Sequence, residues 1–188
     1  MTRPEWMDNG LPACSNGMVI VTGGPGGGKS TLLAALAELG YATFVEVPRQ
    51  LIEAQSQIEG GTLPWQDLAG FAALCLADMQ QQKAQASAMA GPVFLDRAIG
   101  DICAYLGWGG LPVPEHYQAA SQGYHGRVFF CVLDPDSYVQ DDVRPYPFSE
   151  ALALHQQLLG VYRQLGYECI EVPWGSVAER CRFVLSHL

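Results

Sequence analysis

Lysine and arginine are scarce in this sequence of 188 residues. It holds 10 basic residues against 19 acidic ones, and its net charge is −9. Affinity for nucleic acids rests largely on basic side chains that neutralise phosphates, so this balance excludes nucleic acid as an expected partner. Lys29 and Lys83 are the two lysines, and a site for a small anion must therefore draw on a few concentrated cations.

Long apolar runs are also absent. No stretch reaches the roughly 18 apolar residues that a membrane-spanning helix needs, and the start of the chain carries no apolar core typical of a secretion signal. We therefore expect no membrane partner and a cytoplasmic location. Residues 1–17, rich in Pro, Gly, Asn and Asp, are predicted to form a flexible N-terminal arm, and residues 18–188 a single globular domain.

The cysteines and histidines lack the arrangement of a metal site. The six cysteines form no CxxC motif and have no histidine at metal-ligand spacing. Those beyond the arm fall in apolar patterns, and we predict that they are reduced core residues: Cys75, Cys103, Cys131, Cys169 and Cys181. The histidines form no cluster and receive no chemical role: His116, His125, His155 and His187.

Short apolar runs alternate with helical patterns along the rest of the chain. The runs are nearly continuous in apolar character, which is typical of strands covered by helices on both faces. They predict five strands, at 18–23, 42–47, 91–96, 127–134 and 167–174, and helices at 29–39, 48–58, 65–90, 150–165 and 177–187. This alternation indicates an α/β three-layer sandwich with a five-stranded, mainly parallel sheet, whose ligand lies beyond the carboxyl ends of the strands.

One motif stands between the first predicted strand and the first predicted helix. Gly23, four further residues, and then Gly28, Lys29 and Ser30 match the pattern G-x-x-x-x-G-K-[ST] of a phosphate-binding P-loop. Backbone amides of such a loop surround phosphates, its lysine reaches the β- and γ-phosphates, and its serine hydroxyl binds Mg²⁺. The motif predicts binding of ATP or GTP with Mg²⁺, through Gly23, Gly24, Pro25, Gly26, Gly27, Gly28, Lys29, Ser30 and Thr31.

Acidic and basic residues follow two other predicted strands. Asp96 stands where a second acid for Mg²⁺ is expected, with Arg97 next to it as a candidate phosphate ligand. The alternative is that Asp96 caps the following helix and Arg97 is a solvated neighbour. Glu46, near the end of the second strand, is a candidate general base or substrate-binding acid, with Arg49 close by; the alternative is an exposed carboxylate at a strand end.

The segment 134–151 combines four aspartates with a single arginine, Arg144. An arginine on a mobile segment can close over transferring phosphates, and the alternative is a solvated, charge-balanced turn. Arg127 and Arg180 are interpreted as structural residues of a strand and a helix.

Residues 23–52, 93–106, 137–173 and 176–185 together resemble the AAA-like ATP-binding proteins whose P-loop domain is similar to a nucleotide kinase. They are more distantly similar to the kinase domain of nicotinamide riboside kinase proteins. The resemblance implies a kinase-like strand order, with the P-loop strand central and the third strand beside it. The chain departs from the AAA name, because it has neither a second-region arginine finger nor a C-terminal helical lid domain.

The resemblance also implies roles for individual residues. Glu46 would meet the acceptor hydroxyl, Asp96 with Arg97 would serve metal and phosphate, and Arg144 would act as the lid arginine. The lid departs from an arginine-rich kinase lid because prolines flank its one arginine. The nucleotide base would lie near 173–175, where Trp174 either stacks on it or is a core or edge aromatic.

Two functions follow from these residues. The first is an ATP- and Mg²⁺-dependent phosphotransferase with a small-molecule acceptor, nucleosides among the candidates, and a closed acceptor pocket between 46–60 and 98–110 beside Glu46 would favour it. The second is a nucleotide-dependent switch or slow ATPase that regulates a protein partner. The segment 107–114 fits a substrate loop or an interface equally well, and the sequence does not determine the acceptor, the choice between ATP and GTP, or the oligomeric state.

Overall fold

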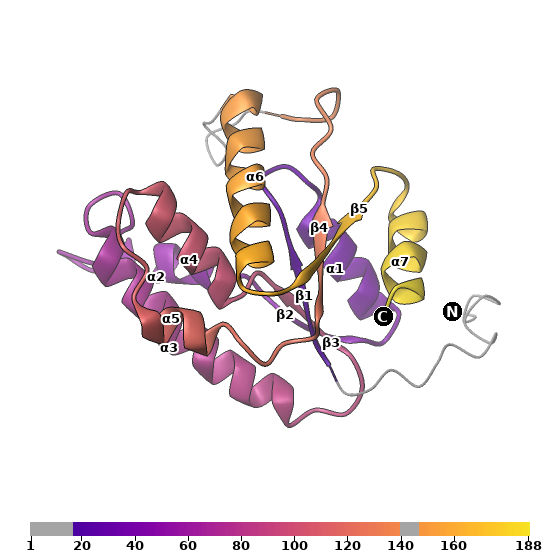
Figure 1. Cartoon of the computed structure of the whole chain (residues 1–188), viewed down its shortest axis with the longest axis horizontal. Coiled ribbons are helices and arrows are strands. Elements are labelled where there is room, and N and C mark those ends of the chain that lie inside the picture. The colour runs from indigo at the N-terminus through magenta and orange to yellow at the C-terminus, as the bar shows by residue number, and fades with distance from the viewer. Residues whose placement is uncertain (1–16, 140–146) are drawn as a thin grey trace.

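The computed structural model describes residues 17–139 and 147–188. Its five strands form one parallel sheet in the order β2-β3-β1-β4-β5. The strands are β1 (Met18–Thr22), β2 (Ala42–Phe44), β3 (Val93–Asp96), β4 (Arg127–Cys131) and β5 (Glu168–Val172). The P-loop strand β1 is therefore central with β3 beside it, which confirms the strand order implied by the resemblance (Figure 1).

Burial follows the position of each strand in the sheet. The central strands β1, β3 and β4 are almost wholly buried, whereas the edge strands β2 and β5 are only partly covered. Both edge strands are shorter than the sequence predicted. The chain leaves β2 at Phe44, so Glu46 lies beyond the strand and directly before the next helix.

Helices cover both faces of the sheet (Figure 1). Successive strand residues point to opposite faces, so Val19 and Val21 pack against α1 (Lys29–Glu38) and α7 (Val177–Ser186). Ile20 packs on the other side with α6 (Phe148–Gln164). This arrangement is the predicted three-layer α/β sandwich of a P-loop NTPase.

A second core lies among the helices alone. It is formed by α2 (Val47–Gln55), α3 (Leu68–Ser87), α4 (Ile99–Trp108) and α5 (Glu115–Ala120). No bounds were predicted for α4 or α5 from the sequence. Helix α4 is buried almost all round for its first two turns, so it lacks the polar stripe that marks an amphipathic helix. Helix α5 is a short segment inside a region rich in glycine and proline.

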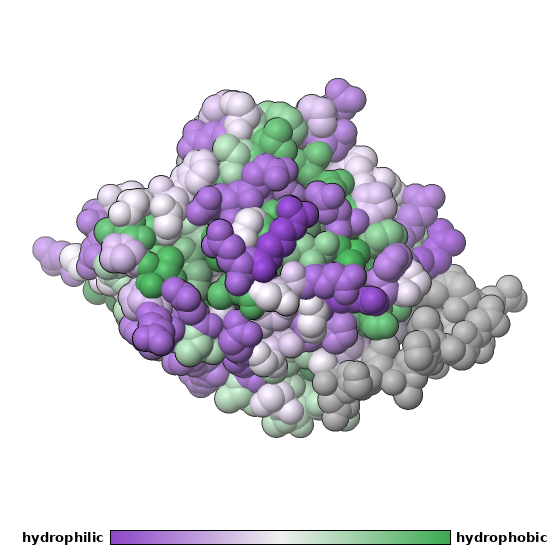
Figure 2. All heavy atoms as spheres, in the orientation of Figure 1, coloured by the Kyte–Doolittle hydropathy of each residue, from purple (hydrophilic) through white to green (hydrophobic). Residues whose placement is uncertain are grey.

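The predicted cysteine state is confirmed. Every cysteine in the described part of the chain is free, and four are buried while Cys169 is partly exposed. Cys14 and most of the predicted N-terminal arm fall outside the described residues. Within the described ranges, no helix is long and apolar enough to cross a membrane. On the face seen in Figure 2, exposed hydrophobic residues form small patches among hydrophilic ones.

The packing of α4 against α6 predicts opposite effects for two glycines. A Cβ at Gly100 would lie 2.6 Å from the Tyr162 ring, whereas a Cβ at Gly160 would meet nothing within 4 Å. Gly100→Ala should therefore lower the free energy of unfolding by about 1–3 kcal/mol. Gly160→Ala should raise it by about 0.5–1 kcal/mol, because alanine is the better helix former. Urea unfolding of both variants tests the packing, and equal effects would contradict it.

Candidate active site

The P-loop connects the carboxyl end of β1 to α1. Its glycines allow close packing, since a Cβ at Gly23 would lie 2.8 Å from the carbonyl oxygen of Cys131 on β4. Gly28 is the N-cap of α1 and has a left-handed backbone, with φ of 70°, which glycine adopts at little cost. The loop therefore wraps over the start of α1, where backbone amides and the helix dipole favour an anion.

Lys29 lies inside this loop. Its side chain is buried, and Nζ donates hydrogen bonds to the carbonyl oxygens of Gly23 at 3.1 Å and Gly24 at 3.0 Å. Burial, with Arg97 as the second cause, lowers the pKa of Lys29 to about 8. Ser30 and Thr31 follow in the first turn of α1 and are exposed. The predicted cation is thus held at the centre of the loop with a hydroxyl residue beside it in sequence.

Asp96 ends β3 at the same edge of the sheet. The register pairs it with Val21 of β1, so it reaches the level at which the P-loop begins. The carboxyl group is buried, and its Oδ1 has no hydrogen-bond partner among the described residues. Burial, followed by the charge of Glu46, raises the pKa of Asp96 to about 6.

The unpartnered oxygen of Asp96 fits a magnesium ion. Mg²⁺ prefers oxygen ligands and is usually bound by one or two carboxylates together with substrate phosphates and water. The described residues contain no group of three or more His, Cys, Asp or Glu side chains that could hold a metal. The alternative that Asp96 caps the next helix is wrong, because Asp101 accepts the hydrogen bond from the Ala98 amide at the start of α4.

Arg97 is buried and joined to Glu46. Its Nε donates to Glu46 Oε1 at 2.8 Å, and its side chain is 6% exposed against 26% for that of Glu46. Burial alone would raise the pKa of Glu46, but Arg97 and Lys29 hold it below the usual range. Glu46 is therefore an ionised carboxylate oriented by an arginine, and the alternative of a solvated Arg97 is wrong.

The backbone of Arg97 is strained. It is the non-glycine residue with positive φ in the described chain, at 66°, a region that side chains with a Cβ rarely adopt. Its amide donates to the Val21 carbonyl at 3.0 Å, which ties the strained turn to the P-loop strand. Strain of this kind persists where the surroundings fix it and gathers at functional sites.

Asp101 is the site residue that sequence reasoning missed. It is fully buried on α4, and its carboxylate accepts hydrogen bonds from Arg97 Nη1 at 2.9 Å and Tyr162 Oη at 2.6 Å. It also accepts from Thr22 Oγ1 at the end of β1. Asp101 stands four residues after Arg97, but no helix bounds were predicted over this segment from the sequence, and Arg97 itself precedes α4 in a left-handed conformation.

His155 on α6 was also missed. It is buried, and its Nδ1 accepts a hydrogen bond of 3.2 Å from the backbone amide of Gly24. Nδ1 must therefore be unprotonated, which is the neutral tautomer with its proton on Nε2. Burial lowers the pKa of His155, and nearby Lys29 lowers it further while Glu171 opposes both. Although it belongs to no histidine cluster, His155 positions the P-loop.

Arg180 lies on α7 and contacts the P-loop, so its role is not confined to its own helix. Its Nη2 donates to the Gly27 carbonyl at 2.7 Å, and its guanidinium lies 5.4 Å from the centre of the Trp174 ring. Trp174 follows β5 and is 43% exposed, so it is not a core aromatic. The structure thus places the candidate base-stacking residue beside the phosphate-binding loop.

Two other arginines were singled out in the sequence besides the cluster formed by Lys29, Glu46, Asp96 and Arg97. Arg49 is exposed and pairs with Glu53 on its own helix at 3.4 Å. Arg144 lies outside the described residues, and its role stays a prediction. The remaining candidates meet at the carboxyl end of the sheet: Lys29, Glu46, Asp96 and Arg97. Their charges shift one another's pKa values.

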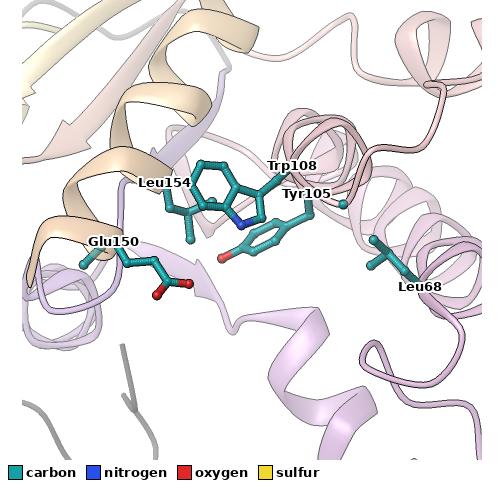
Figure 3. A pocket seen from close by; sticks show the side chains of 7 residues that line it. Leu68, Tyr105, Trp108, Glu150 and Leu154 are labelled. Atoms are coloured by element: carbon teal, nitrogen blue, oxygen red, sulfur yellow. The ribbon is translucent and has the colours of Figure 1, made fainter. Parts of the chain in front are cut away.

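A pocket of about 150 Å³ opens between the starts of α3 and α6 and the end of α4. Trp108 and Gly109 line it, so the segment 107–114 contributes to a cavity as the sequence allowed. The other walls are formed by Leu68 of α3, Tyr105 of α4, and Glu150, Ala151 and Leu154 of α6. Figure 3 shows the carboxyl group of Glu150 turned toward Tyr105, with Trp108 and Leu154 close by in the view.

The buried and exposed arginine pairs predict a large difference in stability. The two residues of each pair are four positions apart, but Arg97 precedes α4, whereas Arg49 and Glu53 both lie on α2. Asp101→Asn should lower the free energy of unfolding by about 3–5 kcal/mol, because it leaves a buried charge unpaired. Glu53→Gln should change it by no more than about 0.5 kcal/mol. Chemical denaturation measures both, and similar losses would refute the central role of Asp101.

His155 predicts a pH dependence of stability. Its pKa in the folded chain lies below the ordinary 6.5, so the unfolded chain binds the proton more readily and stability falls as pH drops below that value. His155→Gln removes this contribution. The stability of the natural chain relative to the variant should therefore decrease from pH 7 to pH 5, while the titration of Asp96 cancels in the difference. A difference independent of pH would contradict the assignment.

The fold is similar to solved nucleotide-handling kinases. Thymidylate kinase from Ehrlichia chaffeensis matches with a TM-score of 0.61 and 16% identity, over 92% of this chain and 99% of that one. A NadR protein in complex with NR matches with 0.66 and 17%, over 92% and 52%. Deoxyadenosine kinase from M. mycoides matches with 0.61 and 12%, over 90% and 97%. At these identities the likeness shows the P-loop kinase fold.

Sequence comparison gives the family. No curated protein matches the chain at a significant level. The sequence profile of the family described as AAA domain matches residues 18–180, which span the P-loop, Asp96, Asp101, His155 and the loop with Trp174. Because this match covers most of the chain, the protein belongs to that AAA-domain family, and its fold is similar to that of P-loop kinases.

Proposed function

We propose that this protein is an ATP- and Mg²⁺-dependent phosphotransferase that acts on a small-molecule acceptor. The observation that carries the proposal is the Glu46–Arg97 ion pair beside Lys29 and Asp96. Nucleotide binding alone needs the P-loop, its lysine and an acid for the metal. A second, ionised carboxylate held at the same sheet edge is the group that a transferase requires for an acceptor hydroxyl.

Transfer in such a site depends mainly on positioning and charge. The P-loop amides and Lys29 would hold the β- and γ-phosphates, and Glu46 would accept the hydroxyl proton as the acceptor oxygen bonds to the γ-phosphorus and the bond to ADP breaks. Arg97 orients Glu46 and adds positive charge near the transferring group. Ser30 and Asp96 would hold Mg²⁺, which when bound neutralises phosphate charge.

The nucleotide base belongs beside Trp174 in this proposal. The ring is half exposed and rests on Arg180, which also contacts the P-loop. A base that stacks on Trp174 would be linked to the phosphate site through Arg180, which contacts both the Trp174 ring and the P-loop. This contact tolerates either purine, so the proposal covers ATP and GTP.

The matched structures support a nucleoside-like acceptor. One is a thymidylate kinase, one a deoxyadenosine kinase, and one a NadR protein with bound nicotinamide riboside. Deoxyadenosine and nicotinamide riboside are nucleosides with a free sugar hydroxyl, whereas thymidylate already carries a phosphate. For this chain we propose a free sugar hydroxyl as the attacking group.

The test is formation of ADP from ATP and Mg²⁺, with and without single acceptors from a set of nucleosides and nicotinamide riboside. Glu46→Gln should lower kcat by roughly 10²- to 10⁴-fold while ATP affinity stays unchanged. Lys29→Ala is the matched control at the phosphate site and should abolish ATP binding. Normal turnover by Glu46→Gln would remove this residue from the mechanism.

The same measurements separate the competing function. An acceptor that gains the phosphate, with ADP formed only in its presence, supports the transferase. Slow phosphate release that no acceptor changes would contradict it and support the nucleotide-dependent switch.

A further inference from the structure

The pocket between α3, α4 and α6 lies next to the acceptor side of the site. Tyr105 forms part of its wall, and the centre of the Tyr105 ring is 5.8 Å from the guanidinium carbon of Arg97. Arg97 in turn binds Glu46. The Tyr105 ring therefore lies between the pocket and the Glu46–Arg97 ion pair that would meet the acceptor hydroxyl. A small molecule could place its ring in the pocket and its hydroxyl beside Glu46.

The size and walls of the pocket suit a planar ring. Its volume of about 150 Å³ is that of an apolar cavity that accepts benzene. Tyr105 and Trp108 supply two aromatic side chains, and Leu68 and Leu154 supply aliphatic ones (Figure 3). Trp108 is 45% exposed, so the ring of a ligand has a path to its face from solvent.

The charged side chain that lines the pocket is a carboxylate. Glu150 lies in the first turn of α6, where the helix dipole stabilises negative charge. None of the described lining residues is lysine or arginine. A carboxylate beside aromatic faces attracts positive charge or N–H donors, because aromatic faces also carry partial negative charge.

The acceptor side of the site has few cationic groups that could bind a phosphate carried by the acceptor. Nε and Nη1 of Arg97 already bind Glu46 and Asp101. Lys29 is held inside the P-loop, and Arg49 pairs with Glu53 away from the pocket. An acceptor that already carried a phosphate would meet the carboxylates of Glu46 and Glu150, and none of the described residues that line the pocket is a cation.

We infer that the pocket binds the planar ring of an unphosphorylated nucleoside-like acceptor, and that Glu150 selects rings that present positive charge or N–H donors. This inference rests on the proposed function and adds its specificity. Trp108 and Tyr105 hold the ring, Glu150 contacts its electropositive edge, and the sugar extends past Tyr105 toward Glu46. Nucleoside monophosphates are rejected because their phosphate would meet carboxylates.

The test compares acceptors that differ in charge at matched size. Nicotinamide riboside carries a positive ring, its reduced dihydro form is neutral, cytidine presents an amino group, and thymidine monophosphate carries a phosphate. The variants are Glu150→Gln and the control Glu38→Gln, an exposed glutamate on α1 in the opposite layer. Readouts are KM and kcat for each acceptor, and binding without ATP followed by tryptophan fluorescence, with Trp108→Phe to assign the signal.

We expect Glu150→Gln to raise KM for the positive or amino-bearing rings by roughly ten- to a hundredfold, with kcat nearly unchanged. Its effect on the reduced form should be small, and Glu38→Gln should behave as the natural chain. Equal effects of Glu150→Gln on all acceptors, or preference for the monophosphate, would overturn the inference while the transferase stands. Ring binding that depends on Glu150 without any phosphoryl transfer would instead refute the proposed function and leave the pocket assignment intact.

Discussion

The buried contact between Asp101 and Arg97 is the interaction on which the acceptor side of the site depends. Arg97 is held in a left-handed backbone conformation, and its guanidinium is divided between Asp101 and the ionised Glu46. Because Asp101 also accepts from Thr22 and Tyr162, one carboxylate joins the end of β1, the start of α4 and the last turn of α6. It fixes a strand and two helices of one face of the sheet at the point where chemistry is expected.

The charge distribution explains how an acidic chain can bind an anion. The net charge is −9, but Lys29 and Arg97 are both buried within the loop region, where electrostatic interactions are stronger than in water. Glu46 and Asp101 neutralise Arg97 in part. The phosphate site therefore relies on backbone amides and one lysine more than on a basic surface, in agreement with the scarcity of cations in the sequence.

Local patterns were sufficient to predict the sheet and to locate the P-loop motif between its first strand and first helix. Apolar strands and the G-x-x-x-x-G-K-[ST] motif are each visible within a short window, and the structure confirms a parallel five-stranded sheet with β1 at its centre. The roles of Asp101 and His155 were not predicted because their partners, Tyr162 and Gly24, are 61 and 131 residues away in the sequence. The role of Arg180 was not predicted for the same reason, since its contact with Gly27 joins the two ends of the domain. A single sequence reports spacing along the chain, whereas these roles depend on contacts across it.

Helix α6 contacts both the P-loop and the pocket. His155 accepts the amide of Gly24 in the P-loop, and the pocket is lined by Leu154, directly before His155, and by Ala151, one turn earlier. A rotation of the helix that widened the pocket would also displace the group that receives the Gly24 amide. In the function that we propose, the free energies of nucleotide and acceptor binding would therefore be coupled through α6, and such coupling is reciprocal: whatever an occupied pocket did to the affinity for nucleotide, bound nucleotide would do in equal measure to the affinity for the acceptor.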